Sequence, residues 1–196
     1  MRKRKKLYEG KAKILYETDE PQYLIQEFKD DATAFNGKKK GRIANKGYVN
    51  NQVSGHIFRY LASYYVPNHF VDFHSDVAMV VRRLDMILVE VVVRNIAAGS
   101  FLKRTKHKEG DVLPKPVIEF YLKDDALGDP QITEKEIFQK ELCTPEELET
   151  IRRLSLKINA LLKSFFGRRN IQLVDFKLEF GRTPDGKILL ADEISP

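Results

Sequence analysis

Three charged residues near the end of the sequence are spaced as one face of a β-strand. Asp175, Lys177 and Glu179 alternate with apolar residues between positions 173 and 181. Because successive side chains of a strand point to opposite faces, this alternation puts the three charges on one face and the apolar residues on the other. One face is then core, and the other is available for chemistry or for solvent.

An acidic residue further along joins this face if the strand turns back on itself. The sequence Thr183-Pro-Asp-Gly186 is typical of a tight turn, because proline fixes φ and glycine accepts a positive φ. If Arg182 lies opposite Lys187, then Asp192 falls opposite Lys177 and points to the charged face. A slip of one residue would remove it from that face.

Glu179 and Asp192 together predict a cation site. Like charges held close together repel unless a cation lies between them, and a small number of oxygen ligands suits Mg²⁺ that carries the phosphates of a nucleotide. The alternative is a solvated strand face on which these acids form cross-strand ion pairs.

The composition is that of a soluble globular protein. With 196 residues, 42% of them hydrophobic and 32% charged, the chain is long enough for one sizeable domain or two small ones. It contains no apolar run that could span a bilayer, and its basic first residues do not lead into the apolar region of a signal peptide, so we expect a cytosolic protein without membrane contact. The single cysteine, Cys143, excludes an internal disulfide framework and a cysteine-rich metal site.

The positive net charge indicates an anionic partner. A formal charge of +6 favours either nucleic acid or phosphorylated small molecules. The aromatic residues occupy apolar periodic positions and do not alternate with the basic runs, so the sequence lacks the stacking platform of single-strand-binding proteins. Phosphorylated small molecules are therefore favoured, and a basic nucleic-acid-binding module remains the non-enzymatic alternative.

A glycine followed by two lysines near the N-terminus could cover a phosphate. Residues 7–16 predict a hairpin that turns near Gly10, with Lys11 and Lys13 on one face after the turn. Glycine lets backbone amides approach a phosphate, and the lysines supply positive charge. A Walker motif and a kinase glycine triplet are both absent, and the alternative is a solvated basic hairpin.

The next segments predict strands and one helix. The polar stretch 31–47 is expected to be a long loop that closes over a ligand, or else a disordered basic connector, and a helix is expected from Asn50 until just before Val66. Strands are expected at 69–73, 78–83 and 88–95. Met86 lies at the join between the last two, where a linker between two lobes would be.

Arg94 and Ser100 predict a phosphate site. Arg94 lies near the end of the apolar strand 88–95, and small residues lead from it to Ser100, which could cap a helix that begins at Phe101. A hydroxyl, backbone amides and the positive end of a helix would then converge close to an arginine, which is a combination suited to a phosphate group.

The second half of the chain predicts a strand that ends in a lysine and a long packing helix. Lys123 lies at the end of the expected strand 117–125, before a turn. Thr144 fits the N-cap of a helix whose capping box is completed by Glu147 and which ends at Gly167. Its apolar stripe assigns this helix to the core.

In order and spacing, several of these segments resemble the phosphoribosylaminoimidazole-succinocarboxamide synthase (SAICAR synthetase) family of purine biosynthesis. Two signature blocks of the family correspond to residues 93–100 and 173–181, and the resemblance covers essentially the whole chain. The other matching segments are residues 7–13, 28–34, 46–47 with 50–51, 123–130 and 191–196.

The resemblance implies an ATP-dependent ligase that joins L-aspartate to the carboxylate of the ribotide CAIR through an acyl phosphate, giving SAICAR, ADP and phosphate. It also implies an α+β, two-lobed, ATP-grasp-like fold with the nucleotide in the cleft. The antiparallel N-terminal lobe with one helix would be residues 1–85, and the second α+β lobe would be residues 86–196. Mg²⁺ would accompany ATP.

The sequence does not reveal the oligomeric state, and we expect a homo-oligomer. A small-molecule kinase with a similar nucleotide lobe is the alternative enzyme.

The resemblance further implies roles for single residues. Those that match the ATP site are Gly10, Lys11 and Lys13 over the phosphates, Met86 beside the adenine and Lys123 on the nucleotide side. Those that match the substrate site are Arg94 and Ser100 at the ribotide phosphate and Asp129 as a further candidate. Glu179 and Asp192 match the Mg²⁺ ligands. Asp175 and Lys177 match the reaction centre, where Lys177 would steady the carboxylate that is phosphorylated.

The sequence departs from the family at its end. The family continues beyond Pro196 into a segment with further substrate-contacting residues, including an arginine, and a C-terminal helix. If the protein ends at Pro196, we expect the ribotide site to be incomplete.

Overall fold

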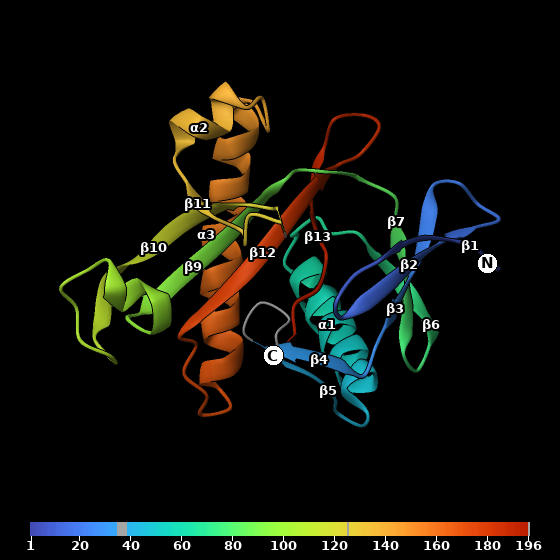
Figure 1. Cartoon of the computed structure of the whole chain (residues 1–196), viewed down its shortest axis with the longest axis horizontal. Coiled ribbons are helices and arrows are strands. Elements are labelled where there is room, and N and C mark those ends of the chain that lie inside the picture. Colours follow the sequence, from blue (N-terminus) through green and yellow to red (C-terminus); the bar gives the residue numbers. More distant parts are fainter. Residues whose placement is uncertain (35–38, 125, 196) are drawn as a thin grey trace. The chain divides into compact units, whose positions relative to one another are not determined.

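The structure, a computed structural model, describes residues 1–34, 39–124 and 126–195 (Figure 1). It has a mixed, sheet-rich α+β fold, which confirms the predicted fold class at that level. The chain divides into two compact units, Met1–Asp85 with Gly181–Pro196 and Met86–Phe180. Among the described residues, no helix is both long and apolar enough to cross a membrane.

The first unit is built on a five-stranded antiparallel sheet. Its strands follow the order β1-β2-β3-β7-β6, with the bounds Lys3–Glu9, Lys13–Thr18, Tyr23–Phe28, Ala78–Arg82 and Phe70–Ser75. The strands expected at 69–73 and 78–83 are confirmed by β6 and β7. The hairpin expected around Gly10 is formed by β1 and β2, and the N–H of Gly10 donates to the carbonyl of Lys13 at 2.9 Å.

Helix α1 (Lys46–Ser63) packs against this sheet and begins four residues before the predicted start at Asn50. The early start has a local cause. The Asp30 carboxylate accepts the backbone N–H of Gly47 at 3.0 Å and so satisfies a donor of the first turn, since the residue before the helix provides no side-chain cap. Gly47 has no room for a side chain, because a Cβ there would lie 2.7 Å from the carbonyl oxygen of Phe28.

Part of the segment 31–47, which we predicted to be a loop, is a β-hairpin. Strands β4 (Asp31–Ala34) and β5 (Lys39–Arg42) pair antiparallel, with Asp31 opposite Arg42. The sequence gives little sign of it, because a polar two-stranded ribbon lacks the alternation of apolar residues that marks a half-buried strand. Residues 35–38 of that prediction lie outside the described residues.

Residues 181–196 group with the first unit, whereas we expected them in the second lobe. Hydrogen bonds account for this grouping. The N–H of Leu190 donates to the carbonyl of Pro67 at 3.0 Å, and the N–H of His69 donates to the carbonyl of Leu190 at 2.9 Å. The hydroxyl of Ser54 in α1 donates to the carbonyl of Ile194 at 3.1 Å. The last strand, β13 (Ile188–Ala191), and the residues that follow it are therefore hydrogen-bonded to the first unit.

The turn before β13 differs from the predicted turn by one residue. The N–H of Thr183 donates to the carbonyl of Lys187, and the N–H of Gly186 donates to the carbonyl of Thr183, both at 2.9 Å. Thr183, and not Arg182, therefore lies opposite Lys187, and Gly186 takes a positive φ of 78° as the extra residue of the turn.

The predicted register, which placed Asp192 on the charged strand face, is wrong. Asp192 follows β13 with a φ of 63°, where strand alternation no longer sets the direction of a side chain.

The second unit is built on strands in the order β11-β10-β9-β12. Their bounds are Gln131–Ile132, Val112–Leu122, Val89–Ile96 and Asp175–Arg182, the last of which crosses the boundary between the units after Phe180. Strand β9 lies between two neighbours, as its apolar sequence predicted, and Val89, Val91 and Val93 are buried. The short strand β8 (Asp85–Met86) lies at the other crossing of the boundary.

Two helices complete the second unit. Both α2 (Glu134–Gln139) and α3 (Pro145–Gly167) begin with a threonine capping box, and α3 contacts β9 (Figure 1). The predicted N-cap at Thr144 and the predicted end at Gly167 are confirmed. The stripe of α3 that includes Ile151, Ile158 and Leu162 is buried, so the helix serves packing.

We expect Thr144→Ala to lower the free energy of unfolding by about 1 kcal/mol. The substitution removes the hydroxyl that accepts the N–H of Glu147 at 3.2 Å, and it leaves the buried face of α3 unchanged. Urea denaturation measures the loss. The control is Thr144→Ser, which keeps the hydroxyl and should unfold close to the unsubstituted protein. Equal losses in both variants would show that the cap does not contribute.

Ser100 does not cap a helix, in contrast to the prediction. The 3₁₀ helix η1 (Gly99–Lys103) begins after Ala98 without a side-chain cap, and Ser100 lies within it. Gly99 turns the chain with a φ of 54°, and the element starts before Phe101 as a short 3₁₀ helix. The predicted α-helix end at Ser100 is therefore absent from this site, which retains the Ser100 hydroxyl and Arg94.

Candidate active site

In the first unit, the predicted phosphate loop and one predicted metal ligand contact each other. Lys13, the first residue of β2, forms an ion pair with Asp192 and lies 3.6 Å from a carboxylate oxygen of Glu193. The side chains of Lys13 and Asp192 are largely buried, and Gln26 donates to the backbone carbonyl of Asp192 at 3.2 Å. Lys11 is exposed in the turn between β1 and β2. One basic and two acidic groups therefore meet where the β1–β2 hairpin reaches the end of β13.

A neutral histidine lies beside this group and was not identified from the sequence. His69 is buried, with its ring edge-on to Phe58 at a centroid distance of 5.1 Å. Burial lowers the pKa of His69 to about 4, although the Asp192 carboxylate opposes the shift. His69 therefore adds no positive charge at neutral pH, whereas Lys13 forms an ion pair with Asp192.

In the second unit, Glu179 is the centre of a charged group on β12. It is only 2% exposed, and both Lys123 and Lys177 form ion pairs with its carboxylate. Lys123 reaches it from the end of β10, and Lys177 lies two residues earlier on β12, on the same strand face. The structure thus brings together three of the residues that the sequence singled out.

Glu90 belongs to the same group and was missed by the sequence analysis. Its carboxylate pairs with the Lys177 ammonium at 3.0 Å. Burial raises the pKa of Glu90, an effect that Lys177 opposes and the Glu179 charge increases. The available signal was a lone acidic residue in the apolar run Val89–Val93, where a carboxylate needs a cationic partner.

Arg94 is the centre of a second charged group in this unit. It lies directly opposite Asp175 in the antiparallel pairing of β9 and β12 and forms an ion pair with it. Its Nε donates to the Glu119 carboxylate at 2.6 Å, and its Nη2 lies 3.5 Å from the Ser100 hydroxyl. The structure therefore joins Arg94, Ser100 and Asp175, which the sequence singled out, and adds Glu119, which it did not.

The two remaining predicted residues have less specific surroundings. Met86 is half-buried in β8, at the boundary between the units. Asp129 has a φ of 50°, and its carboxylate accepts the N–H of Asp124 at 3.0 Å, so it stabilises the turn after β10. Its charge also acts on Glu90 and raises the pKa of that group slightly.

The predicted Mg²⁺ ligands have suitable chemistry within their own units. Among the described residues, no three or more His, Cys, Asp and Glu side chains form a group that could hold a metal ion. Mg²⁺ in nucleotide sites needs fewer protein ligands, usually one or two carboxylates besides phosphate oxygens and waters. Glu179 and Asp192 are both shielded carboxylates that already hold cationic groups.

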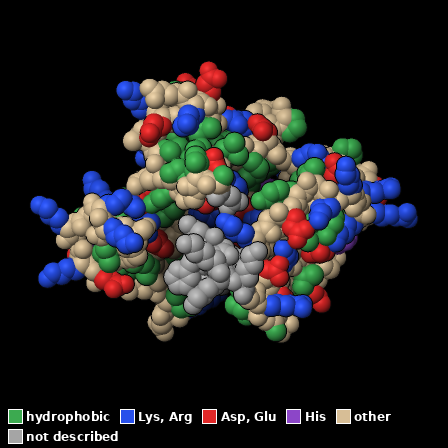
Figure 2. Space-filling model, viewed as in Figure 1, with side chains coloured by type: hydrophobic (Ala, Val, Ile, Leu, Met, Phe, Trp, Pro, Cys, Tyr) green, Lys and Arg blue, Asp and Glu red, His purple; other side chains and the backbone are tan. Residues whose placement is uncertain are grey.

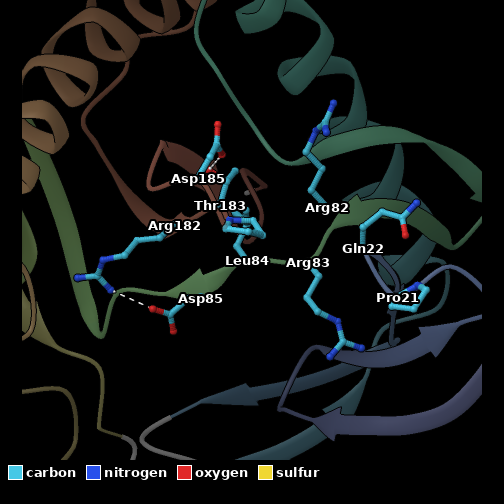
Figure 3. Close-up of a pocket in the computed structure, with 10 residues that line it drawn as sticks. Pro21, Gln22, Arg82, Arg83, Leu84, Asp85, Arg182, Thr183 and Asp185 are labelled. Atoms are coloured by element: carbon cyan, nitrogen blue, oxygen red, sulfur yellow. Dashed lines mark hydrogen bonds and ion pairs between the residues drawn. The ribbon is translucent and has the colours of Figure 1, made fainter.

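A cavity of about 730 Å³ lies elsewhere in the first unit (Figure 3). Leu84 lies near its centre, and Arg82, Arg83 and Arg182 point in different directions around it. Arg182 is turned towards Asp85, at 3.3 Å. None of the predicted site residues lines this cavity.

Basic and acidic side chains are mixed on the one face displayed in Figure 2. On the face displayed in Figure 2, Lys and Arg side chains are scattered among Asp and Glu side chains and form no continuous basic stripe. A basic stripe or patch is the usual footprint of a nucleic-acid-binding surface.

Comparison with known proteins gives matches over nearly the whole chain. The family model described as SAICAR synthetase matches residues 6–196. The phosphoribosylaminoimidazole-succinocarboxamide synthase of Chlorobium phaeobacteroides is 56% identical over 196 residues, which cover 100% of this chain and 83% of the relative. That of Acaryochloris marina is 52% identical over 190 residues, which cover 97% and 78%.

Solved structures agree with these matches. The phosphoribosylaminoimidazole-succinocarboxamide synthase of Ehrlichia chaffeensis superimposes with a TM-score of 0.95 at 44% identity, over 98% of this chain and 82% of that chain. A SAICAR synthetase in complex with ADP superimposes with a TM-score of 0.93, also at 44% identity, over 96% and 80%. These relatives support neither a small-molecule kinase nor a nucleic-acid-binding module. The resemblance seen in the sequence is confirmed, and the chain belongs to the SAICAR synthetase family.

Proposed function

We propose that this protein joins L-aspartate to the carboxylate of CAIR at the expense of ATP, giving SAICAR, ADP and phosphate in purine biosynthesis. The observation that carries the proposal is the match to SAICAR synthetases over nearly the whole chain, including a solved relative in complex with ADP. The two charged groups in the second unit and the Lys13 group in the first supply the types of side chain that this reaction requires.

The chemistry explains why lysines, arginines and acids are needed and a protein nucleophile is not. A carboxylate is a poor electrophile, because its leaving group would be oxide. In the proposed reaction an oxygen of the CAIR carboxylate takes the γ-phosphoryl group of ATP, and ADP leaves. The ammonium of aspartate loses one proton to become an amine, which attacks the acyl carbon. Phosphate leaves, and the nitrogen loses a second proton and keeps one as the N–H of the amide. Both steps depend on positioning and on neutralising charge.

For the nucleotide, we assign the phosphates to the Gly10 turn with Lys11 and Lys13, and the adenine to the neighbourhood of Met86. Lys123 is assigned to the nucleotide side of the second unit. The Lys13 ammonium is held by Asp192 and is therefore already positioned near the turn. Such a lysine neutralises phosphate charge without reorganising when the nucleotide arrives.

For the metal, we assign Mg²⁺ to the carboxylates of Glu179 and Asp192. When bound, the ion would neutralise phosphate oxygens during phosphoryl transfer. The two carboxylates pair with lysines and are shielded from solvent, so each is an oxygen ligand held in place before a metal arrives. The lysine ammonium groups, which have three N–H donors each, could donate to phosphate oxygens of the nucleotide while they stay paired with these carboxylates.

For the substrates, we assign the ribotide phosphate to Arg94 and Ser100, and Asp129 to the substrate side. Lys177 would steady the CAIR carboxylate while it accepts the phosphoryl group, because its ammonium is fixed between Glu90 and Glu179. Asp175 would line the reaction centre and hold Arg94 in orientation through their ion pair.

We also propose the finer features of the architecture and setting that the family implies. These are a two-lobed, ATP-grasp-like arrangement with the nucleotide in the cleft, a homo-oligomeric state and a cytoplasmic location. Size-exclusion chromatography with light scattering tests the oligomeric state directly, and a monomer at micromolar concentration would contradict it.

The experiment that tests the function is a coupled assay of ADP release in which ATP, CAIR and L-aspartate are omitted in turn. We expect release to require all three. Release without aspartate, in the presence of a hydroxyl acceptor, would indicate a kinase. Absence of release with all three substrates would contradict the proposal.

We expect Lys13→Met to raise the KM for ATP by roughly tenfold, the cost of about one charge-assisted hydrogen bond. The reason is that the substitution removes the positioned ammonium, which pairs with the shielded Asp192 carboxylate and lies 3.6 Å from that of Glu193. Steady-state kinetics measure the KM for ATP. The control is Lys5→Met, which removes the same charge from an exposed position on β1. Equal KM values for ATP in the two variants would contradict the phosphate assignment.

A further inference from the structure

Glu119 on β10 is a buried carboxylate that has no role in the proposed mechanism so far. It is 7% exposed, and two arginines donate to its two oxygens, Arg94 through Nε and Arg104 through Nη2, each at 2.6 Å. The Tyr121 hydroxyl donates to it at 3.1 Å, and Gln131 approaches it at 3.4 Å. One side chain thus fixes the positions of two guanidinium groups.

Glu119 is ionised at neutral pH. Burial alone would raise its pKa, but the hydrogen bonds and charges of Arg94 and Arg104 outweigh burial and hold the pKa below the usual value of a glutamate. Its negative charge is therefore permanent in the folded protein under physiological conditions. A neutral amide in its place would accept from the arginines much more weakly.

The two arginines differ in what they can still offer a ligand. The Arg94 side chain is 8% exposed and directs its donors to Glu119, Asp175 and Ser100. The Arg104 side chain is 36% exposed, and within the described part of the chain it donates only through Nη2, to Glu119 and Tyr121. The Nε and Nη1 groups of Arg104 therefore remain for a ligand.

Arg104 also lies next to the assigned phosphate site along the chain. Ser100 lies inside η1, and Arg104 closes η1 by donating its N–H to the carbonyl of Phe101 at 3.1 Å. Arg94 contacts Ser100 directly and is linked to Arg104 through the shared Glu119 carboxylate. Arg94, Ser100 and Arg104 therefore belong to one connected group.

We propose that Arg104 donates to the 5′-phosphate of the ribotide together with Arg94 and Ser100, and that Glu119 is the positioning residue for both guanidinium groups. The inference rests on the proposed function, because the ribotide is its substrate. An arginine with unused N–H donors suits two oxygens of a phosphate, and Arg94, which already serves two carboxylates, has little left to give.

The test uses three variants and two ligands. The variants are Arg104→Gln, Glu119→Gln and, as the matched control, Lys103→Gln. Lys103 is the exposed cation next to Arg104 on η1 and lies outside the Glu119 group, so it reports the effect of losing a nearby positive charge. The ligands are CAIR as substrate and its 5′-dephosphorylated riboside as a competitive inhibitor.

We expect Arg104→Gln to raise the KM for CAIR by roughly 10- to 100-fold and to leave the KM for ATP and the inhibition constant of the riboside within roughly twofold. Glu119→Gln should raise the KM for CAIR in the same way, because both arginines lose their common anchor. Lys103→Gln should stay close to the unsubstituted enzyme. A role in packing alone would not distinguish the ribotide from the riboside.

Three results would overturn the inference. These are an unchanged KM for CAIR in Arg104→Gln, an equal loss of ribotide and riboside, and an equal rise in KM for Lys103→Gln. Thermal unfolding shows whether each variant is folded. If Glu119→Gln does not fold, the inference is tested with Arg104→Gln alone, because Arg104 is more exposed. Failure of the proposed function is seen separately, as a lack of CAIR-dependent ADP release by the unsubstituted enzyme.

Discussion

Glu179→Gln should lower kcat of the ligation by roughly 10²- to 10³-fold, the usual effect of removing one preorganised electrostatic group from a reaction centre. The Glu179 carboxylate is almost fully buried and anchors both Lys123 and Lys177. Under the proposed function it also binds Mg²⁺. Loss of its charge therefore removes the carboxylate partner of Lys123, one of the carboxylate partners of Lys177, and one assigned metal ligand.

The matched control for this variant is Glu90→Gln. Glu90 also pairs with Lys177, at 3.0 Å, but it is not an assigned metal ligand. We expect Glu90→Gln to lose less activity and to keep the same Mg²⁺ concentration for half-maximal rate, whereas Glu179→Gln requires more Mg²⁺. Steady-state rates over a range of Mg²⁺ concentrations measure both effects. An identical Mg²⁺ dependence in the two variants would show that Glu179 acts only as a partner of lysine.

The parts of this molecule that follow from local sequence were predictable. Thr144 and Glu147 form the expected capping box, the apolar run in β9 is central in its sheet, and the Gly10 turn joins two strands. Each of these depends on residues within a few positions of one another, where capping, alternation and turn chemistry act directly.

The parts that depend on pairing between distant segments were not predictable. Arg94 and Asp175 are 81 positions apart in the sequence, and only the register of β9 with β12 sets them opposite each other. Glu90 and Glu119 each interrupt a strand as a single acid, a pattern that equally describes a solvated strand face. Burial and cationic partners distinguish them, and both are properties of the assembled sheet.

The wrong prediction of the β12–β13 register also arises because strand pairing cannot be derived from local sequence alone. The sequence Thr183–Gly186 fits a turn in either of two registers, and the choice depends on whether glycine lies within a four-residue turn or adds one residue to it. The hydrogen bonds of Thr183 show that the second register forms, in which glycine adds one residue to the turn. Because side chains alternate between the two faces of a strand, a register difference of one residue changes the face on which a residue is expected. The predicted face of Asp192 is therefore wrong, although the turn lies where it was predicted.

Arg94→Ala should raise the KM for CAIR by roughly 100-fold or more, because it removes a charge-assisted contact to the ribotide phosphate and also releases the group that Arg94 organises. Arg94 is 6% exposed and donates to both Glu119 and Asp175, so its loss leaves two carboxylates without their shared cation. Glu119 keeps Arg104 as a partner and Asp175 is partly exposed, so the free energy of unfolding should fall by about 1–3 kcal/mol.

Arg94→Lys separates the two effects. It keeps the positive charge, but a single ammonium cannot reach Glu119, Asp175 and a phosphate with the planar fork of a guanidinium. We therefore expect Arg94→Lys to recover part of the lost stability while the KM for CAIR stays high and the KM for ATP stays normal. Urea denaturation and steady-state kinetics on the same preparations measure both quantities. A folded Arg94→Lys enzyme with an unchanged KM for CAIR would contradict the phosphate assignment, because the charge at residue 94 would then matter only for the fold.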